Sequence, residues 1–148
     1  MVQKIASLID ETLMAMNAHL HVQMTNEEKA YLDAHFELIQ IKKGEHLMNR
    51  GDEVCYLYYL EAGTIQLSFP DKGKREISAR FIEPKEFINF SLSHEEQLSH
   101  YNVKALEHSK VWRLSKHDLQ QLYDLSINFN KLARLHLEKS INQKIKRE

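Results

Sequence analysis

The sequence predicts an α+β chain built on an antiparallel β-roll, a double-stranded β-helix of the jelly-roll type, with N-terminal helices and a long C-terminal helix. Three of the four glycines, Gly44, Gly51 and Gly63, lie among β-branched, aromatic and apolar residues in the stretch 41–64. Because glycine reaches positive φ without a Cβ penalty, this spacing predicts short strands joined by tight turns. Such strands are typical of an antiparallel roll. Helical spacing of apolar residues on either side predicts the helices.

Residues 1–36 are predicted to form two helices. The first covers residues 3–22, which contain no glycine or proline and carry apolar residues at spacings of three and four. These apolar residues are Ile5, Leu8, Ile9, Leu13, Met16 and Leu20. Thr25 begins the second helix, since Thr25 followed by Glu28 matches a capping box. Its predicted buried stripe consists of Tyr31, Leu32 and Phe36.

Residues 37–115 are predicted to form the roll, because the period changes from helical to alternating at Glu37. The segment 54–60 is apolar enough to be buried on both faces, and we expect its cysteine, Cys55, to be buried as a small hydrophobe. The next strand, 65–69, alternates and should show Gln66 and Ser68 to water. The predicted strands are Leu38–Ile41, Leu47–Met48, Val54–Leu60, Ile65–Phe69, Arg75–Ile82, Tyr101–Leu106 and Lys110–Leu114. A hairpin at 70–74 should place Gly73 in the left-handed position.

Residues 116–148 are predicted to form C-terminal helices. Ser115 is the expected N-cap of a helix through Tyr123, with Asp118 placed to favour the cap and the helix dipole. A basic helix with a long apolar stripe follows, and an exposed stripe of this kind marks an interface. We therefore predict a homodimer through Phe129, Leu132, Ala133, Leu137, Ile141 and Ile145. The alternative is that this helix folds back on its own roll, against the acidic N-terminal helix.

Composition restricts the function further. The 148 residues suffice for one domain, and their net charge of −1 gives no global field for nucleic acid or membrane. The ends differ in sign: residues 1–37 carry two lysines against six acids, and residues 131–148 carry six basic residues against two acids. One cysteine excludes a disulfide framework. No apolar run approaches the ~18 residues of a membrane span, so we expect a cytoplasmic protein with no membrane partner.

Several short motifs, in this order, resemble those of the effector domain of the catabolite activator and fumarate-nitrate regulator (Crp/Fnr) family. They are Lys43-Gly44-Glu45, Gly51-Asp52, Tyr58 to Leu60 with Gly63, Lys72-Gly73-Lys74, Val103 to Glu107, and Leu114 to Leu119. The resemblance covers residues 25–148 and implies a cyclic-nucleotide-binding fold. The run Tyr101 to Leu122 is most similar to the branch of this family found in Bacteroidetes-type bacteria, which often lacks the nucleotide signature.

The resemblance also implies a phosphate-binding cassette, and here its chemistry is altered. The family pattern is Phe-Gly-Glu followed by an arginine, a small residue and an alanine, with the glutamate on the ribose and the arginine on the cyclic phosphate. This chain has Phe87, then Ile88 for the glycine and Asn89 for the glutamate. In the second part of the cassette, Ser99, His100 and Tyr101 stand where the arginine, small residue and alanine belong. We therefore expect no cofactor and no binding of cyclic AMP or cyclic GMP.

Other kinds of site have little support. The nine histidines show no metal-ligand spacing, and His19 and His21 lie on different faces of a helix. No nucleophile elbow, motif around a carboxylate pair or phosphate loop indicates an enzyme. The roll could enclose an apolar effector among Phe81, Phe87, Phe90 and Tyr101, with a filled core as the equal alternative.

Two functions remain for this chain. The first is the sensory and dimerisation domain of a transcription regulator, which would bind DNA only through a helix-turn-helix encoded beyond Glu148. The second is a stand-alone module that acts by binding another protein, without DNA. The first is our main hypothesis, and the second is its alternative.

Overall fold

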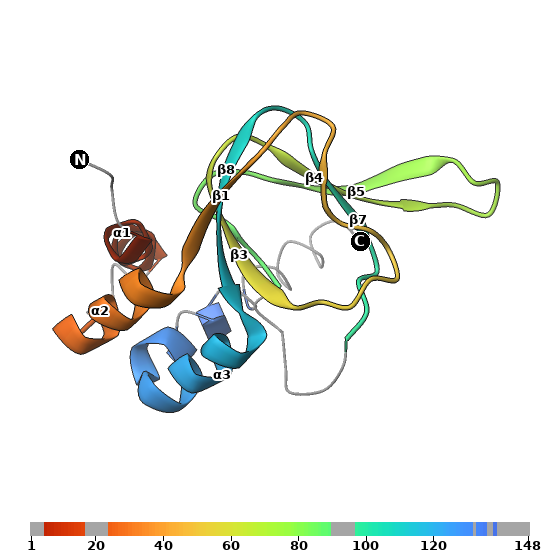
Figure 1. Cartoon of the computed structure of the whole chain (residues 1–148). Coiled ribbons are helices and arrows are strands. Elements are labelled where there is room, and N and C mark those ends of the chain that lie inside the picture. The colour runs from red at the N-terminus through yellow and green to blue at the C-terminus, as the bar shows by residue number, and fades with distance from the viewer. Residues whose placement is uncertain (1–4, 17–23, 90–96, 132, 136–137, 139–148) are drawn as a thin grey trace.

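The computed structural model describes residues 5–16, 24–89, 97–131, 133–135 and 138. Helices precede and follow a set of eight short strands (Figure 1). In chain order the elements are α1 Ile5–Met16, α2 Asn26–His35, β1 Glu37–Ile41, β2 His46–Met48, β3 Tyr56–Ala62, β4 Ile65–Pro70, β5 Glu76–Ile82, β6 Phe87–Ile88, β7 Asn102–Ala105, β8 Ser109–Ser115 and α3 Lys116–Leu125.

The strands form two four-stranded antiparallel sheets. One has the order β1-β8-β3-β6 and the other β2-β7-β4-β5. Apart from the β4–β5 hairpin, consecutive strands alternate between the sheets, which is the connectivity of a jelly roll. The predicted fold class is therefore confirmed. Figure 1 shows the β4–β5 hairpin projecting from one side of the roll and the three helices gathered on the other.

The N-terminal helices form as the sequence predicts within the described residues. Thr25 caps α2 with a complete capping box, in which its hydroxyl accepts from the Glu28 N–H and its own N–H donates to the Glu28 carboxylate. Leu32 and Phe36 are buried and Tyr31 is half-buried. Helix α1 packs on the first sheet, where the buried Thr12 and Tyr59 hydroxyls lie 2.9 Å apart.

Strand β3 is the centre of the core, as predicted, with Leu57, Tyr58, Tyr59 and Leu60 all buried. It begins at Tyr56, two residues later than expected. Cys55 therefore precedes the strand and is exposed, so its predicted burial is wrong. The reason is local: Val54 is buried, the next side chain, Cys55, is exposed, and the Cys55 thiol lies 3.6 Å from the carbonyl of Glu53.

The predicted glycine turns form, since Gly44, Gly51 and Gly63 all have positive φ. The hairpin is different, because Gly73 does not adopt positive φ and Lys74 does, at 62°. Asp71 causes this: its carbonyl accepts from the Lys74 N–H, and its carboxylate accepts from the Arg75 N–H. These bonds place the left-handed residue next to the returning strand, so the prediction for Gly73 is wrong.

The alternation expected along β4 is interrupted by an irregularity in its pairing with β5 between Leu67 and Ser68. Ser68 is 2% exposed, although the pattern predicts that it faces water. Its hydroxyl donates to the Glu76 carboxylate, which also accepts from the Asn102 side chain at 3.0 Å. Neighbouring strands therefore cover Ser68, and no pattern within β4 alone could indicate this.

Ser115 caps α3, as predicted, by accepting from the Asp118 N–H at 3.2 Å. After Ser126, residues 127–131, 133–135 and 138 are helical. Among the described residues, no helix is long and apolar enough to span a membrane.

Candidate functional site

The first half of the predicted cassette is part of the core. Phe87 pairs with Tyr59 and Ile88 with Tyr58 in the β3–β6 ladder. Phe87 is 1% exposed and its ring centroid lies 4.8 Å from that of Tyr59 in an edge-on arrangement. Ile88 is 6% exposed. Both side chains are therefore buried, on opposite faces of the sheet, with Phe87 on the face where Tyr59 contacts α1.

Asn89 has a backbone role. Its φ is 76°, in the left-handed region, which asparagine tolerates better than most residues other than glycine. Its side-chain amide donates to the carbonyl of Tyr56 at 3.1 Å. Asn89 thereby ends β6 and fixes the exit of the chain toward residues 90–96, which lie outside the described residues.

The second half of the cassette is anchored to the turn around Gly51. The Gly51 N–H donates to the Ser99 carbonyl, and the Ser99 N–H donates to the Asp52 carbonyl, both at 2.8 Å. The Ser99 hydroxyl donates to the Tyr101 carbonyl at 2.6 Å and accepts from the Tyr101 N–H at 3.3 Å. The hydroxyl is thus engaged by its own loop, while His100 is exposed and Tyr101 is 37% exposed.

Both halves of the cassette therefore contact the same stretch, residues 51–56, one through Asn89 and the other through Ser99. The apolar residues predicted to line a shared pocket are not brought together. Phe81 is 51% exposed whereas Phe87 is buried, and Phe90 lies outside the described residues. Tyr101 instead faces Phe69, with ring centroids 6.2 Å apart.

Sequence reasoning missed a charged and aromatic cluster on the first sheet. Arg113 lies opposite both Glu37 on β1 and Tyr58 on β3. Its guanidinium is 3.1 Å from the Glu37 carboxylate and 4.6 Å from the centre of the Tyr56 ring, a cation–π distance. Burial raises the pKa of Tyr58 to about 12, against the opposing effect of Arg113. Only the strand register brings these residues together, so no sequence motif indicates the cluster.

An incoming anion would meet competition from carboxylates at two arginines of the roll. Arg113 is held by Glu37, and Arg80 is held by Glu86 at 3.0 Å. A phosphate would have to displace a carboxylate from either guanidinium. The histidines offer no metal site in the described part of the chain, where no three His, Cys, Asp or Glu residues are placed to share an ion. His19, His21 and His94 lie outside that part.

The predicted dimer residues divide into two groups. Phe129 and Ala133 are 1% and 7% exposed within the single chain, so they contact their own domain in this structure. The Phe129 ring lies 5.9 Å from that of Tyr123. This arrangement corresponds to the alternative in which the helix folds back on its own chain. The other predicted dimer residues, Leu132, Leu137, Ile141 and Ile145, lie outside the described side chains.

The fold is shared with known sensory domains. A family model described as the cyclic nucleotide-binding domain matches residues 38–126. The sensor domain of the transcriptional regulator DNR from Pseudomonas aeruginosa matches with a TM-score of 0.71 and 14% identity, over 97% of this chain and 95% of that one. The N-terminal domain of a transcriptional regulator from Streptomyces coelicolor matches with a TM-score of 0.65 and 23% identity, over 94% of this chain and 90% of that one.

A longer regulator has the same fold over part of its length. The Thermus thermophilus catabolite activator protein matches with a TM-score of 0.65 and 20% identity, and this chain covers 58% of it. Of this chain, 89% is included in that match. At such identities the likeness shows the fold alone. A search of curated proteins found no match.

Proposed function

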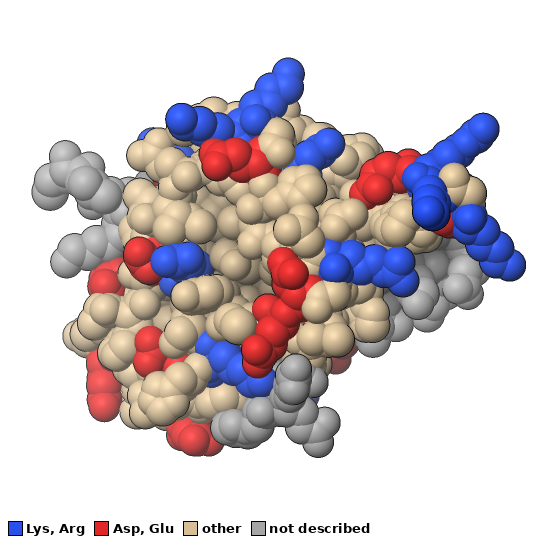
Figure 2. All heavy atoms as spheres, turned by 45° about the vertical axis from the view of Figure 1, so that its right-hand side comes forward, with Lys and Arg blue, Asp and Glu red and all other residues tan. Residues whose placement is uncertain are grey.

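The chain belongs to the cyclic nucleotide-binding domain family, and from that membership we propose that it is the sensory and dimerisation domain of a Crp/Fnr-type transcription regulator. The fold shared with the DNR sensor domain over nearly the whole chain supports this role. DNA recognition by the whole regulator would require a further domain. On the face drawn in Figure 2 basic and acidic side chains are interspersed, which offers no broad basic surface to a nucleic acid.

The proposed domain does not bind cyclic AMP or cyclic GMP. Ser99 stands where the family resemblance implies an arginine, and its hydroxyl is hydrogen-bonded to the backbone of Tyr101. This is the main observation against nucleotide binding. Asn89, in place of the glutamate, is turned to the backbone of Tyr56. Loss of one partner of a buried charge pair costs about 2 to 5 kcal/mol. That is roughly 30-fold to several thousand-fold in affinity.

Calorimetric titration of the chain with each nucleotide tests this part of the proposal. We expect no binding at micromolar nucleotide, and a micromolar dissociation constant for either one would overturn it. The N89E/S99R double variant restores the two family residues. The N89E/H100R variant is the matched control, since it adds the same charges but places the cation on the neighbouring exposed residue. Binding by the first variant alone would show that residue identity, and not backbone geometry, removed the ligand.

A sensory role then requires a different effector, and its chemistry is open because the residues predicted to line an apolar pocket are not brought together. Thermal shift against a metabolite panel, combined with native mass spectrometry of the purified chain, tests for it. A bound species or a stabilising metabolite supports the proposal. A blank result in both experiments would contradict a small-molecule sensor.

Dimerisation through the C-terminal helix is the remaining part of the proposal. Light scattering should give twice the chain mass at tens of micromolar, and a monomer there would remove this part. Gel-shift assays with this chain alone should show no sequence preference, since DNA recognition is assigned to a further domain. The reading frame downstream of residue 148 tests whether a helix-turn-helix is encoded.

A stand-alone protein-binding module is the second candidate function, and exposed apolar side chains favour it. Ile77 and Phe81, both on the edge strand β5, are 39% and 51% exposed, and Leu98 is 53% exposed. Exposed apolar surface of this kind marks contact sites when it is contiguous. A stop codon directly after residue 148 would favour this function over the first.

A further inference from the structure

Glu28 is a buried carboxylate at which the N-termini of two helices meet. It is 6% exposed and lies in the first turn of α2. One carboxylate oxygen, Oε1, accepts from the Thr25 N–H at 2.8 Å, which is the local capping-box bond. The same oxygen accepts from the Asn128 side-chain amide at 2.9 Å, and the other accepts from the Ser126 hydroxyl. Glu28 thus caps its own helix and also binds two residues that lie about a hundred positions later in the sequence.

Ser126 is itself the cap of the helical segment that follows it. Its hydroxyl oxygen accepts from the Phe129 N–H at 2.9 Å while donating its proton to Glu28. Its carbonyl accepts from the Asn130 N–H at 3.3 Å, as at the start of a helix. The Glu28 carboxylate therefore holds the hydroxyl that caps the C-terminal helix, in addition to capping its own helix.

The electrostatics favour a charged carboxylate at this point. Helix N-termini carry the positive end of the helix dipole, so two of them stabilise an anion placed between them. Burial raises the pKa of Glu28, but the hydrogen bonds from Ser126, Thr25 and Asn128 outweigh it and hold the pKa below its ordinary value. Glu28 is anionic in the folded protein near neutral pH.

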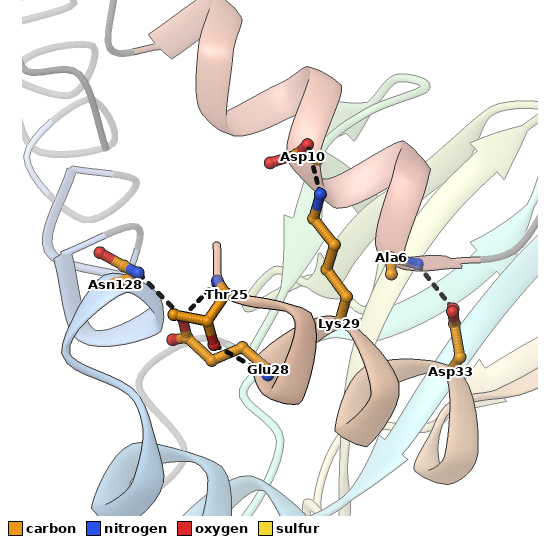
Figure 3. Close-up of polar contacts among 7 residues, drawn as sticks. All are labelled: Ala6, Asp10, Thr25, Glu28, Lys29, Asp33 and Asn128. Atoms are coloured by element: carbon orange, nitrogen blue, oxygen red, sulfur yellow. Dashed lines mark hydrogen bonds and ion pairs between the residues drawn. The ribbon is translucent and has the colours of Figure 1, made fainter. Parts of the chain in front are cut away.

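Helix α2 also connects to the other helices, as Figure 3 shows for α1. Lys29 lies 3.5 Å from the Asp10 carboxylate, and Asp33 accepts from the Ala6 N–H at 2.9 Å. The Tyr31 hydroxyl donates to the Asp118 carbonyl in α3 at 2.8 Å. Figure 3 shows Asn128 beside Thr25 and Glu28, at the N-terminal end of α2. The helix α2 is thus a common support for α1, for α3 and for the start of the C-terminal helix.

We propose that Glu28 is a pin that docks the start of the C-terminal helix on α2 and so keeps Phe129 and Ala133 buried in their own domain. While the pin holds, α2 fixes the direction in which the helix leaves the domain. When the contact is broken, residues 127–135 separate from the roll as a unit and expose that apolar face. The N-terminal helices thereby control the helix to which dimerisation is assigned; this last consequence rests on the proposed function.

Hydrogen exchange of the full chain, read by mass spectrometry at neutral pH, tests the pin. In Glu28→Gln, amides in peptides covering 127–135 should exchange at least ten-fold faster, while those of β3 and β8 keep the wild-type rate. Glu27→Gln is the matched control. It removes the same charge from the same first turn of α2, but Glu27 is exposed, so exchange at 127–135 should be unchanged.

A second variant guards against a general loss of folding in Glu28→Gln. Asn128→Ala leaves the capping box of α2 intact and removes one of the two side chains of the C-terminal segment that donate to Glu28. It should accelerate exchange at 127–135 by about three-fold. Equal rates in the Glu28 and Glu27 variants, or uniform acceleration across the roll in both Glu28→Gln and Asn128→Ala, would overturn the pin. These readouts do not require a dimer, so they fail independently of the light-scattering test.

Discussion

Replacing Gly63 by alanine tests the close approach of the β3–β4 turn to the start of β8. Gly63 lies in the turn between β3 and β4, where φ is +106°. A Cβ placed there would lie 2.0 Å from the Ser109 hydroxyl oxygen and 2.8 Å from the Ser109 Cα. Ser109 is completely buried at the start of β8, so its backbone has little freedom to move away. Gly44 and Gly51 have similar positive φ, but a Cβ at either would meet nothing within 4 Å.

The expected cost of Gly63→Ala has two parts. Left-handed strain costs of order 1–3 kcal/mol for a residue with a Cβ. The overlap with Ser109 adds about 1–3 kcal/mol, typical of overpacking in a tight site. Gly44→Ala and Gly51→Ala should show the strain alone. Gly63→Ala should thus lose about 2–6 kcal/mol of unfolding free energy, from the 5–15 kcal/mol typical of a domain.

Urea unfolding followed by fluorescence measures these differences, because the single tryptophan, Trp112, is 8% exposed in the core. The midpoint should fall furthest for Gly63→Ala, with an unchanged slope. The reasoning is refuted if Gly63→Ala costs no more than Gly44→Ala and Gly51→Ala. In that case the turn relaxes, and the contact with Ser109 does not determine the choice of glycine.

Three further predictions follow from single contacts. Because the folded-state pKa of Glu28 lies below its ordinary value of 4.5, its stabilisation is fully present above about pH 4.5 and is lost as pH falls through the folded-state pKa. The unfolding free energies of wild type and Glu28→Gln in urea should therefore converge as the pH falls below 4.5, and a constant gap would contradict this. Tyr59→Phe removes the hydroxyl 2.9 Å from that of Thr12 and should cost about 1 kcal/mol by the same assay, whereas no change would show that the bond contributes nothing. Cys55 is exposed, so one thiol per chain should react with a thiol reagent in the native state; a requirement for denaturant would indicate burial.

Much of the fold could be predicted because its signals are local. The capping box at Thr25 and Glu28 needs only four consecutive residues, and it forms as predicted. A continuous apolar run likewise identified β3 as the buried strand, although its start was placed at Val54 and not at Tyr56. Such patterns reflect the backbone geometry of one helix or one strand, which the sequence states directly.

The contacts of the candidate site were not predictable from the sequence, and its position stays a prediction from the family resemblance. The resemblance located the cassette at Phe87 and Ser99, yet no pattern indicated that Asn89 would bind the backbone of Tyr56 or that the Ser99 hydroxyl would bind its own loop. Arg113 was missed because its partners come from β1 and β3, the two strands that flank its own strand in the sheet. The side-chain environment of such residues depends on pairings that are distant in sequence.

The sequence by itself predicted the N-terminal helices, seven of the eight strands and the glycine turns, whereas β6 was not predicted as a strand. Tertiary structure alone decided that Glu28 serves a second helix in addition to its own, since Ser126 and Asn128 reach it from about a hundred residues away. It also decided that Phe129 and Ala133 face their own domain. The physical reason is that an apolar stripe requires some apolar surface, and a buried carboxylate requires some hydrogen-bond donors. Which residues supply them depends on the packing of the whole chain.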